Sequence, residues 1–112
     1  MVTSTFAMEL ACDKAEQEGV ALCVVKNSCH FGAAGYYANL AAKRGMIGIS
    51  MSNVDPNMTI PGARGMVIGN NPLAYAAPAQ STPSVFLDVA MSNVASLKVI
   101  QAKKDGKEIP AT

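Results

Sequence analysis

The sequence has 112 residues, of which 50% are hydrophobic and 15% are charged, with a formal net charge of +1. This length is typical of one domain that buries a core without a staple, so we expect residues 1–112 to form a single domain. The charge contains no block of one sign, which argues against a phosphate-backbone partner and predicts no nucleic-acid binding. No apolar run has the length of a transmembrane helix, so no membrane partner is expected.

The cysteines Cys12, Cys23 and Cys29 form an odd set without the paired spacing of a metal site. We therefore expect no metal. Free thiols in a reducing cytoplasm are the simplest explanation of this set. The N-terminus also lacks the layout of a signal peptide, which favours the same cytoplasmic location.

The chain begins with a predicted helix and a predicted strand. Residues 4–18 have helical apolar spacing, with Thr3 or Ser4 as the cap and Gly19 after the last turn. The apolar run 20–25 is rich in β-branched residues and predicts a strand that is buried on both faces.

A second helix and a second strand follow the first pair. Residues 33–44 are rich in alanine and predict a helix that ends at Gly45. Residues 46–51 predict the next strand. Together with the run at 20–25 this order predicts a right-handed, parallel β-α-β unit.

The second half of the chain predicts shorter elements. Prolines and glycines break residues 52–72 into turns. Strands are expected at 73–77 and 84–90, and their short connection favours an antiparallel pair. A helix is expected near 92–104. The predicted fold class is therefore α/β (α+β), with a mixed, largely antiparallel sheet, flanking helices and one parallel β-α-β unit.

His30 is the only histidine of the chain and lies where an apolar run changes to a helical pattern. An imidazole has an ordinary pKa of about 6.5, which suits proton exchange near neutral pH. The turn before a helix can also hold a carbonyl or anionic group beside it, because backbone N–H groups are free there. The alternative is a partly buried histidine that only hydrogen-bonds locally.

Asp88 follows an apolar strand and is the second candidate for chemistry. A carboxylate at the carboxyl end of a buried strand lies where open α/β sheets place their ligands. The alternative is a cap on the helix expected after it. Neither Gly-x-Gly-x-x-Gly nor Gly-x-x-x-x-Gly-Lys-Ser/Thr occurs, so the two standard phosphate-binding loops are missing.

An ordered series of motifs along the chain resembles the malate/L-lactate dehydrogenase family, which includes ureidoglycolate dehydrogenase and is distinct from the Rossmann-fold dehydrogenases. The series runs through Asn27-Ser28-x-His30-Phe31-Gly32-Ala33-Ala34-Gly35-Tyr36-Tyr37, Gly45-x-Ile47-Gly48-Ile49-Ser50, Ser52-Asn53-x-x-Pro56, Gly69-x-Asn71-Pro72-Leu73-Ala74-x-Ala76-x-Pro78, Leu87-Asp88-x-Ala90-x-Ser92 and Ile109-Pro110. Each motif is weak alone, and their common order is specific.

The resemblance implies a non-Rossmann nucleotide-binding domain that uses NAD or NADP to interconvert 2-hydroxy acids and 2-oxo acids, or related imines. It implies that His30 is the catalytic proton acceptor and donor. The cofactor-binding residues that it implies are Asp88, Val89, Ala90, Asn71 and Pro72. The residues that it places near the substrate or behind the site are Ser28, Gly32 and Asp55. The substrate carboxylate is expected to be favoured by the N-terminus of the helix after His30.

Full members of this family are much longer, and the sequence resembles only their middle, cofactor-binding part. A Ser-His-Gly region before it and a Lys-Gly region after it are not in the sequence. We therefore expect a dehydrogenase fragment or truncated chain that is inactive alone. The low charge fraction fits apolar faces that pack against other parts, as in a homodimer or with a complementary chain. A non-catalytic association module and one half of a split dehydrogenase stay open as alternatives.

Overall fold

The computed structural model describes residues 1–109, so Pro110, which closes the series of motifs, lies outside the described residues. The contacts divide the chain into two compact units. The first unit comprises Met1–Ser52 and Asn71–Val89, and the second comprises Asn53–Asn70 and the residues from Ala90 onward. Each unit is described by itself.

The first helix, α1, spans Val2–Glu18 and begins earlier than predicted. Thr3 and Ser4 lie inside it and cap nothing, because Met1 occupies the N-cap position without a side-chain hydrogen bond. Gly19 ends the helix as expected. Its φ of 82° is left-handed, and its N–H donates to the carbonyl of Ala15 at 2.8 Å.

The strand predicted at residues 20–25 does not form. The segment carries no helix or strand, and Val20, Leu22 and Val24 are 80%, 87% and 80% exposed. The prediction is wrong because β propensity reports how well side chains fit a neighbouring strand, and none pairs with this segment. The parallel β-α-β unit is consequently missing from the described sheet, whose strand pairs are both antiparallel.

The second helix, α2, spans Ala34–Lys43 and confirms the prediction to within one residue at each end. Lys43 lies in its last turn, where a cation complements the helix dipole. Gly45 follows with a φ of 77°, and its N–H donates to the carbonyl of Ala42 at 3.0 Å. The alanine-rich face of α2 lies at the centre of the first unit, where it packs against β2.

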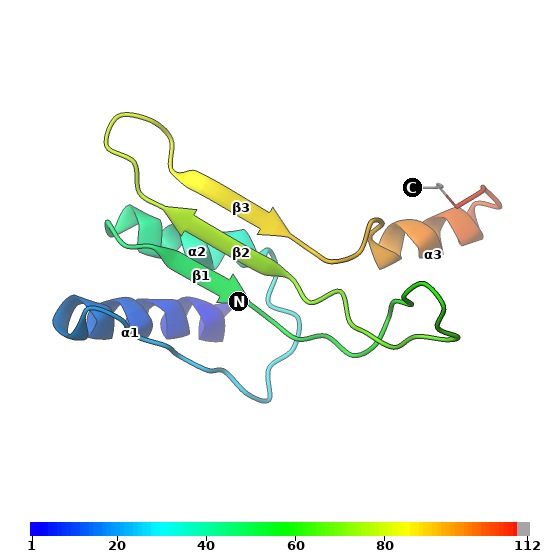
Figure 1. Ribbon diagram of the computed structural model, residues 1–112, viewed down its shortest axis with the longest axis horizontal. Coiled ribbons are helices and arrows are strands. Elements are labelled where there is room, and N and C mark those ends of the chain that lie inside the picture. The colour runs from blue at the N-terminus through cyan, green and yellow to red at the C-terminus, as the bar shows by residue number, and fades with distance from the viewer. Residues whose placement is uncertain (110–112) are drawn as a thin grey trace. The chain divides into compact units, whose positions relative to one another are not determined.

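Three strands form one antiparallel sheet in the order β1-β2-β3 (Figure 1). They are β1 (Gly48–Met51), β2 (Leu73–Ala77) and β3 (Val85–Val89). The bounds of β2 and the antiparallel pairing of β2 with β3 confirm the predictions for the second half of the chain. The helix α2 packs on one face of this sheet and contacts all three strands.

The core between α2 and the sheet is built from small residues. Ala38 of α2 and Ala74 and Ala76 of β2 are completely buried. A Cβ on Gly48 would lie 2.3 Å from the carbonyl oxygen of Ala38, so helix and strand approach each other closely. Only glycine allows this approach, which fixes the height of α2 above β1.

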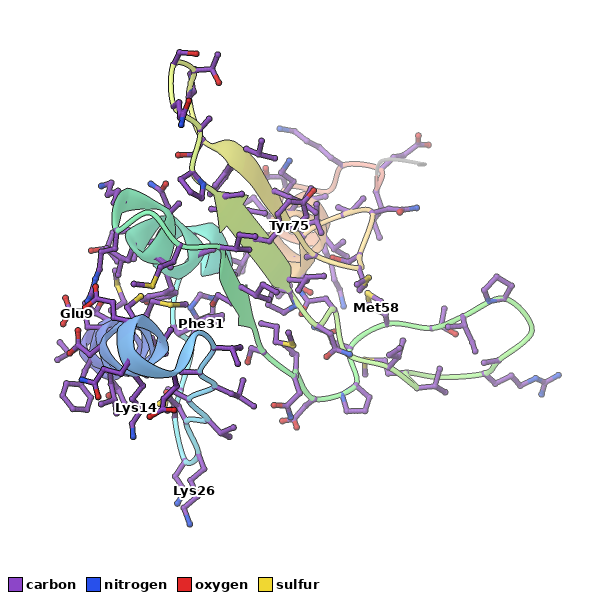
Figure 2. The ribbon with its side chains drawn as sticks, turned by 60° about the vertical axis from the view of Figure 1, so that its left-hand side comes forward. Glu9, Lys14, Lys26, Phe31, Met58 and Tyr75 are labelled. Carbon is purple, nitrogen blue, oxygen red and sulfur yellow. The ribbon has the colours of Figure 1, made fainter. Side chains whose placement is uncertain are left out.

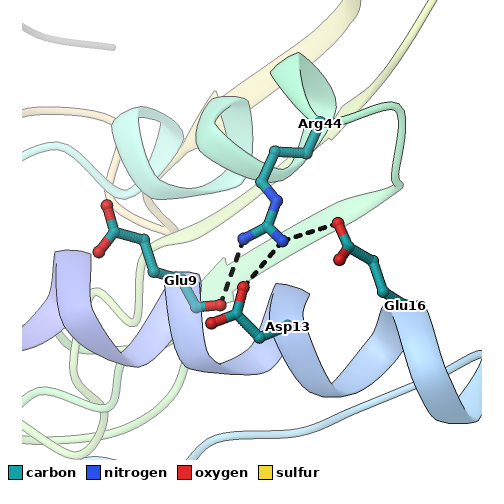
Figure 3. Close-up of polar contacts among 4 residues, drawn as sticks. All are labelled: Glu9, Asp13, Glu16 and Arg44. Atoms are coloured by element: carbon teal, nitrogen blue, oxygen red, sulfur yellow. Dashed lines mark hydrogen bonds and ion pairs between the residues drawn. The ribbon is translucent and has the colours of Figure 1, made fainter.

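The helix α1 packs on α2, and ion pairs of Arg44 connect the two helices (Figure 3). Its guanidinium lies 2.8 Å from a carboxylate oxygen of Asp13 and 2.7 Å from one of Glu16. It also donates to the carbonyl of Glu9 at 3.5 Å. Hydrogen bonds to Glu16 and Asp13 raise the pKa of Arg44, so its charge is permanent. The guanidinium of Arg44 thus connects the C-terminal end of α2 to the turns of α1 that contain Glu9, Asp13 and Glu16.

Among its described residues, the second unit contains one helix, α3, at Ser96–Lys104. It begins four residues later than predicted, after Ala95 in the N-cap position. The segment predicted as turns contains one isolated antiparallel bridge, between Met58 and Ile68. Among residues 1–109, no helix is long and apolar enough to cross a membrane.

Candidate active site

His30 lies in an exposed turn that leads into α2. The backbone is left-handed at Asn27, with a φ of 54°, and at Gly32, with a φ of 88°. Between them the chain folds back so that the N–H of Gly32 donates to Nδ1 of His30 at 3.0 Å. The local hydrogen bond of the alternative interpretation is therefore present, but the ring is exposed rather than partly buried.

This hydrogen bond determines where a neutral His30 carries its proton. The nitrogen that accepts from Gly32 must present a lone pair, so the proton of the neutral ring is on Nε2. Nε2 makes no hydrogen bond to any part of the chain from residue 1 to 109. The turn therefore presents an outward N–H donor next to the beginning of a helix.

Two aromatic residues anchor the turn to the helix. The hydroxyl of Tyr37 donates a hydrogen bond to the carbonyl of Phe31. The two rings are stacked, with centroids 5.4 Å apart, and Tyr37 is 2% exposed. Phe31 lies on the side of the sheet that carries the helices, where it packs against the alanine core (Figure 2). The residue next to His30 is thus fixed by the core.

Asp88 links β3 to the first turn of α2, the helix that follows the turn of His30. Its Oδ2 accepts a hydrogen bond from the backbone N–H of Gly35 at 2.8 Å. Gly35 is the second residue of α2, and Ala33 in the N-cap position supplies no side-chain acceptor. Asp88 therefore satisfies a donor at the N-terminus of α2 that would otherwise be free. It caps α2 and not α3, the helix that follows it in sequence.

This cap corrects the expectation for the substrate carboxylate. A carboxylate already lies against the N-terminal N–H groups of α2, so a second anion there would meet the charge of Asp88. The dipole of α2 is consequently directed at a group of the protein itself. A Cβ on Gly35 would also lie 2.3 Å from the ring of Phe86, which leaves no room for a ligand at this point.

Three of the predicted cofactor residues gather near Asp88 at one end of the sheet. Strands β2 and β3 are antiparallel, and Leu73, the first residue of β2, pairs with Val89, the last residue of β3. Asn71 and Pro72 directly precede β2, so they lie at the same end as Val89. Because Asp88 contacts α2, the turn of His30 is held at this end too.

The other predicted residues are less informative. Ser28 is exposed, and its hydroxyl donates only to the carbonyl of Cys29, at 3.3 Å. Gly32 contributes the N–H that His30 accepts. Asp55 and Ala90 are exposed and belong to the second unit. The structure therefore places Asn71, Pro72, Asp88 and Val89 at one end of the sheet. Asp88 contacts the first turn of α2, which directly follows the turn that contains Ser28, His30 and Gly32.

A shallow hollow of about 440 Å³ borders the turn. Its lining is Met1, Val2, Thr5, Phe6, Glu9 and Tyr36. The side chain of Met1 comes within 3.8 Å of the position that a Cβ on Gly32 would take, so the hollow begins beside Gly32. The side chains that line it include one carboxylate, that of Glu9, and no basic group, so no side chain there can pair with the carboxylate of an oxo acid.

The residues that sequence reasoning missed are Gly35 and Tyr37. Gly35 is the donor to Asp88, and Tyr37 holds the carbonyl of Phe31. Tyr37 was recognisable only as part of an apolar helix face. The signal for Gly35 was a glycine in the first turn of a helix, a place where a helix former is expected unless something approaches closely.

Comparisons with known proteins identify the family of the chain. The family model described as malate/L-lactate dehydrogenase matches residues 1–112. The chain is 45% identical over 104 residues to a malate dehydrogenase of Pyrococcus abyssi, which covers 93% of the chain and 28% of that protein. It is 37% identical over 111 residues to the ureidoglycolate dehydrogenase (NAD(+)) of Escherichia coli K12, which covers 99% of the chain and 32% of that protein.

A solved structure gives the same result. The sulfolactate dehydrogenase of Methanocaldococcus jannaschii matches with a TM-score of 0.84 at 38% identity, over 97% of this chain and 31% of that one. The chain thus spans about a third or less of the length of the relatives that it matches. Its full length nevertheless matches the family model. The chain belongs to the malate/L-lactate dehydrogenase family.

Proposed function

We propose that this chain is the cofactor-binding part of an NAD(P)-dependent oxidoreductase that interconverts a 2-hydroxy acid and a 2-oxo acid, with His30 as the proton-transfer residue. The single observation that carries the proposal is the placement of His30. Its ring is exposed, its free nitrogen points away from the local hydrogen bond, and its turn is tied through Gly35 to Asp88. A surface histidine without a function would need neither the hydrogen bond from Gly32 nor the contact between Gly35 and Asp88.

The residues at the end of the sheet suit part of a dinucleotide. A nicotinamide cofactor supplies the hydride chemistry when it is bound. Asp88 uses one carboxylate oxygen for Gly35, and the other is available to accept from a ribose hydroxyl, a role that acidic residues take in dinucleotide sites. Pro72, directly before β2, offers apolar surface at the same end of the sheet. The site thus suits a neutral sugar or ring better than a phosphate.

We propose that His30 transfers one proton in either direction. In the reduction of an oxo acid the protonated ring gives its Nε2 proton to the carbonyl oxygen of the substrate and becomes neutral, and in the oxidation the neutral ring takes this proton back on Nε2. In both directions Nδ1 carries a proton during the transfer, so it cannot accept the hydrogen bond from the N–H of Gly32. Proton transfer in either direction therefore requires the Gly32 hydrogen bond to open.

The substrate and the cofactor are proposed only as classes. Similar proteins are named as malate, sulfolactate and ureidoglycolate dehydrogenases, all of which act on hydroxy acids. One similar protein is named for NAD(+) and another for NADP(+). We propose NAD or NADP as the cofactor, held without a Rossmann glycine loop. The free cysteines support a cytoplasmic location.

The test compares this chain alone with a chimera in which it replaces the matching residues of the Pyrococcus abyssi malate dehydrogenase. We expect no oxidation of NADH or NADPH with 2-oxo acids by the chain alone, because it spans too little of the relatives to enclose a substrate. We expect the chimera to oxidise malate with one of the two cofactors. A folded chimera that binds neither cofactor would contradict the proposal.

The second candidate function is an association module, or one half of a split dehydrogenase, that binds a complementary chain or a second copy. The observation that favours it is the number of large apolar side chains on the surface of the first unit. A folded chimera without activity, together with a stable dimer of the chain alone, would favour this alternative.

A further inference from the structure

Among the described residues of the first unit, no helix or strand covers one of the two faces of the sheet. Side chains of a strand alternate between the two faces, and those next to α2 are Gly48, Ala74, Ala76, Phe86 and Asp88. The residues between them therefore point to the opposite face. These residues, which we call the open face, are Ile49, Met51, Leu73, Tyr75, Ala77, Val85, Leu87 and Val89.

The open face has the composition of a protein core. It contains no charged residue, and its one polar atom in a side chain is the hydroxyl of Tyr75. Met51 is 65% exposed, Val85 is 56% and Ile49 is 55%. Antiparallel sheets with one face in water normally alternate apolar and polar residues, whereas apolar residues on both faces indicate a sheet with a layer on each side. The helices α1 and α2 lie on the other side (Figure 2).

We infer that the open face packs against a part of the family chain that these 112 residues do not span. More than two thirds of each matched relative lies outside the match, while the matched part keeps its fold with a TM-score of 0.84. The relatives therefore contain enough chain for a second layer. The inference rests on family membership and on this surface, and not on the proposed activity.

The size of the open face favours this occupant over a second copy of the chain. A stable interface between separate proteins uses about 20–30 residues on each side, and the open face has eight. A segment that is covalently joined needs less area, because its effective concentration is high. The face is thus large enough for an internal layer and small for a dimer interface.

A second observation in the same unit supports a missing neighbour. Within the described chain, no backbone group of residues 20–26 takes part in a backbone hydrogen bond. Yet this segment is apolar and β-branched, and unpaired backbone groups of this kind bind a further strand readily. The first unit therefore lacks neighbours at two places, as expected if part of its fold is supplied by more chain.

The test measures the accessibility of the open face by thiol labelling. The three native cysteines are first replaced by alanine. Single cysteines are then introduced as Ile49→Cys and Tyr75→Cys, with Ser81→Cys in the exposed loop between β2 and β3 as the matched control. Labelling rates with a maleimide are compared in the chain alone and in the chimera with the Pyrococcus abyssi protein.

We expect Ile49→Cys and Tyr75→Cys to react at least ten times more slowly in the chimera, a difference of about 1.4 kcal/mol in protection, while Ser81→Cys reacts equally in both. Equal rates at the open face in both proteins would overturn the inference. Protection in the chain alone that increases with its concentration would also overturn it, in favour of a second copy.

A second measurement covers the case in which the chimera does not fold. The chain alone should bind the dye ANS, and the double substitution Ile49→Lys and Tyr75→Lys should remove most of this binding while circular dichroism is unchanged. Sedimentation of the chain alone should show a monomer. A stable dimer that the lysine substitutions dissociate would contradict the inference.

Discussion

The carboxylate of Asp88 accepts a hydrogen bond from the backbone N–H of Gly35, which lies 53 residues earlier in the chain, at 2.8 Å. This contact joins Asp88, the last residue of β3 on the face that α2 covers, to the first turn of α2. Because the turn of His30 precedes α2 directly, the contact also determines where the imidazole lies relative to the end of the sheet. Asp88 is a positioning residue in this account, whatever else it binds.

Replacing Asp88 should weaken the N-terminus of α2. Loss of a helix cap costs about 0.5–2 kcal/mol, so Asp88→Ala should lower the free energy of unfolding by this amount. Asp88→Asn keeps an acceptor oxygen and loses only the charge at the helix dipole, so its effect should be smaller. Urea unfolding followed by circular dichroism measures both. Equal effects of the two substitutions would mean that the hydrogen bond contributes nothing.

Enlarging Gly48 should separate α2 from β1. Gly48→Ala places a Cβ 2.3 Å from the carbonyl oxygen of Ala38, and such overpacking costs about 1–3 kcal/mol. Gly48→Val should be worse than Gly48→Ala, although valine is the better strand former. The unfolding free energies of the wild type, Gly48→Ala and Gly48→Val distinguish overpacking from strand propensity. A valine variant more stable than the alanine variant would contradict the close approach.

Cys12 should make stability depend on pH in the alkaline range. Burial raises the pKa of its thiol above the ordinary value in the folded chain. The contribution of the buried Cys12 thiol to the free energy of unfolding is complete below the thiol pKa of the unfolded chain, about 8.5. This contribution is lost as the pH rises through the higher pKa of the folded chain. Between the two pKa values the unfolded chain has lost a thiol proton that the folded chain retains, so rising pH favours the unfolded chain.

The measurement is the urea midpoint from pH 7 to about pH 10, which spans the thiol range. The wild-type chain should lose stability faster than Cys12→Ala as the pH rises. Cys29→Ala is the matched control, because Cys29 is exposed, and it should follow the wild type. Parallel curves for the wild type and Cys12→Ala would show that the thiol of Cys12 is not buried.

Arg44 should stabilise the contact of α1 with α2 in a salt-dependent way. Its partners Asp13 and Glu16 are more than half exposed, so Arg44→Ala should lower the unfolding midpoint less than Gly48→Val does. The effect should shrink in about 1 M salt, where the Debye length is about 3 Å. Arg44→Lys, which keeps one charge but loses the forked geometry, should be intermediate. An effect that does not change with salt would indicate packing and not charge.

Local patterns predicted much of the fold correctly. The alanine-rich periodicity of residues 33–44, the glycine after it and the alternation in β2 and β3 depend on neighbours in sequence or in one hairpin. The run at 20–25 has the same strand-like composition and forms no strand. Its side chains and backbone need a partner strand, and the sequence of the run cannot tell whether one is supplied.

The sequence indicated which residues to examine as a candidate site but not which contacts they make. The spacing before α2 identified His30, and the position after an apolar strand identified Asp88. The alternative interpretation of Asp88 was a cap on the helix that follows it, because capping is normally local. The structure instead places this carboxylate on α2, a contact that depends on the register of β3 against β2 and on the close approach at Gly35.

The most direct test of the central claim is the turnover number of the chimera with and without the imidazole of His30. His30→Asn should lower kcat by about 100-fold or more, as loss of a general acid does, with circular dichroism and cofactor affinity unchanged. The variant Cys29→Ala, in the same exposed turn, serves as the control and should keep kcat within a few-fold. A His30→Asn chimera that turns over as fast as its parent would contradict the assignment of His30 as the proton-transfer residue.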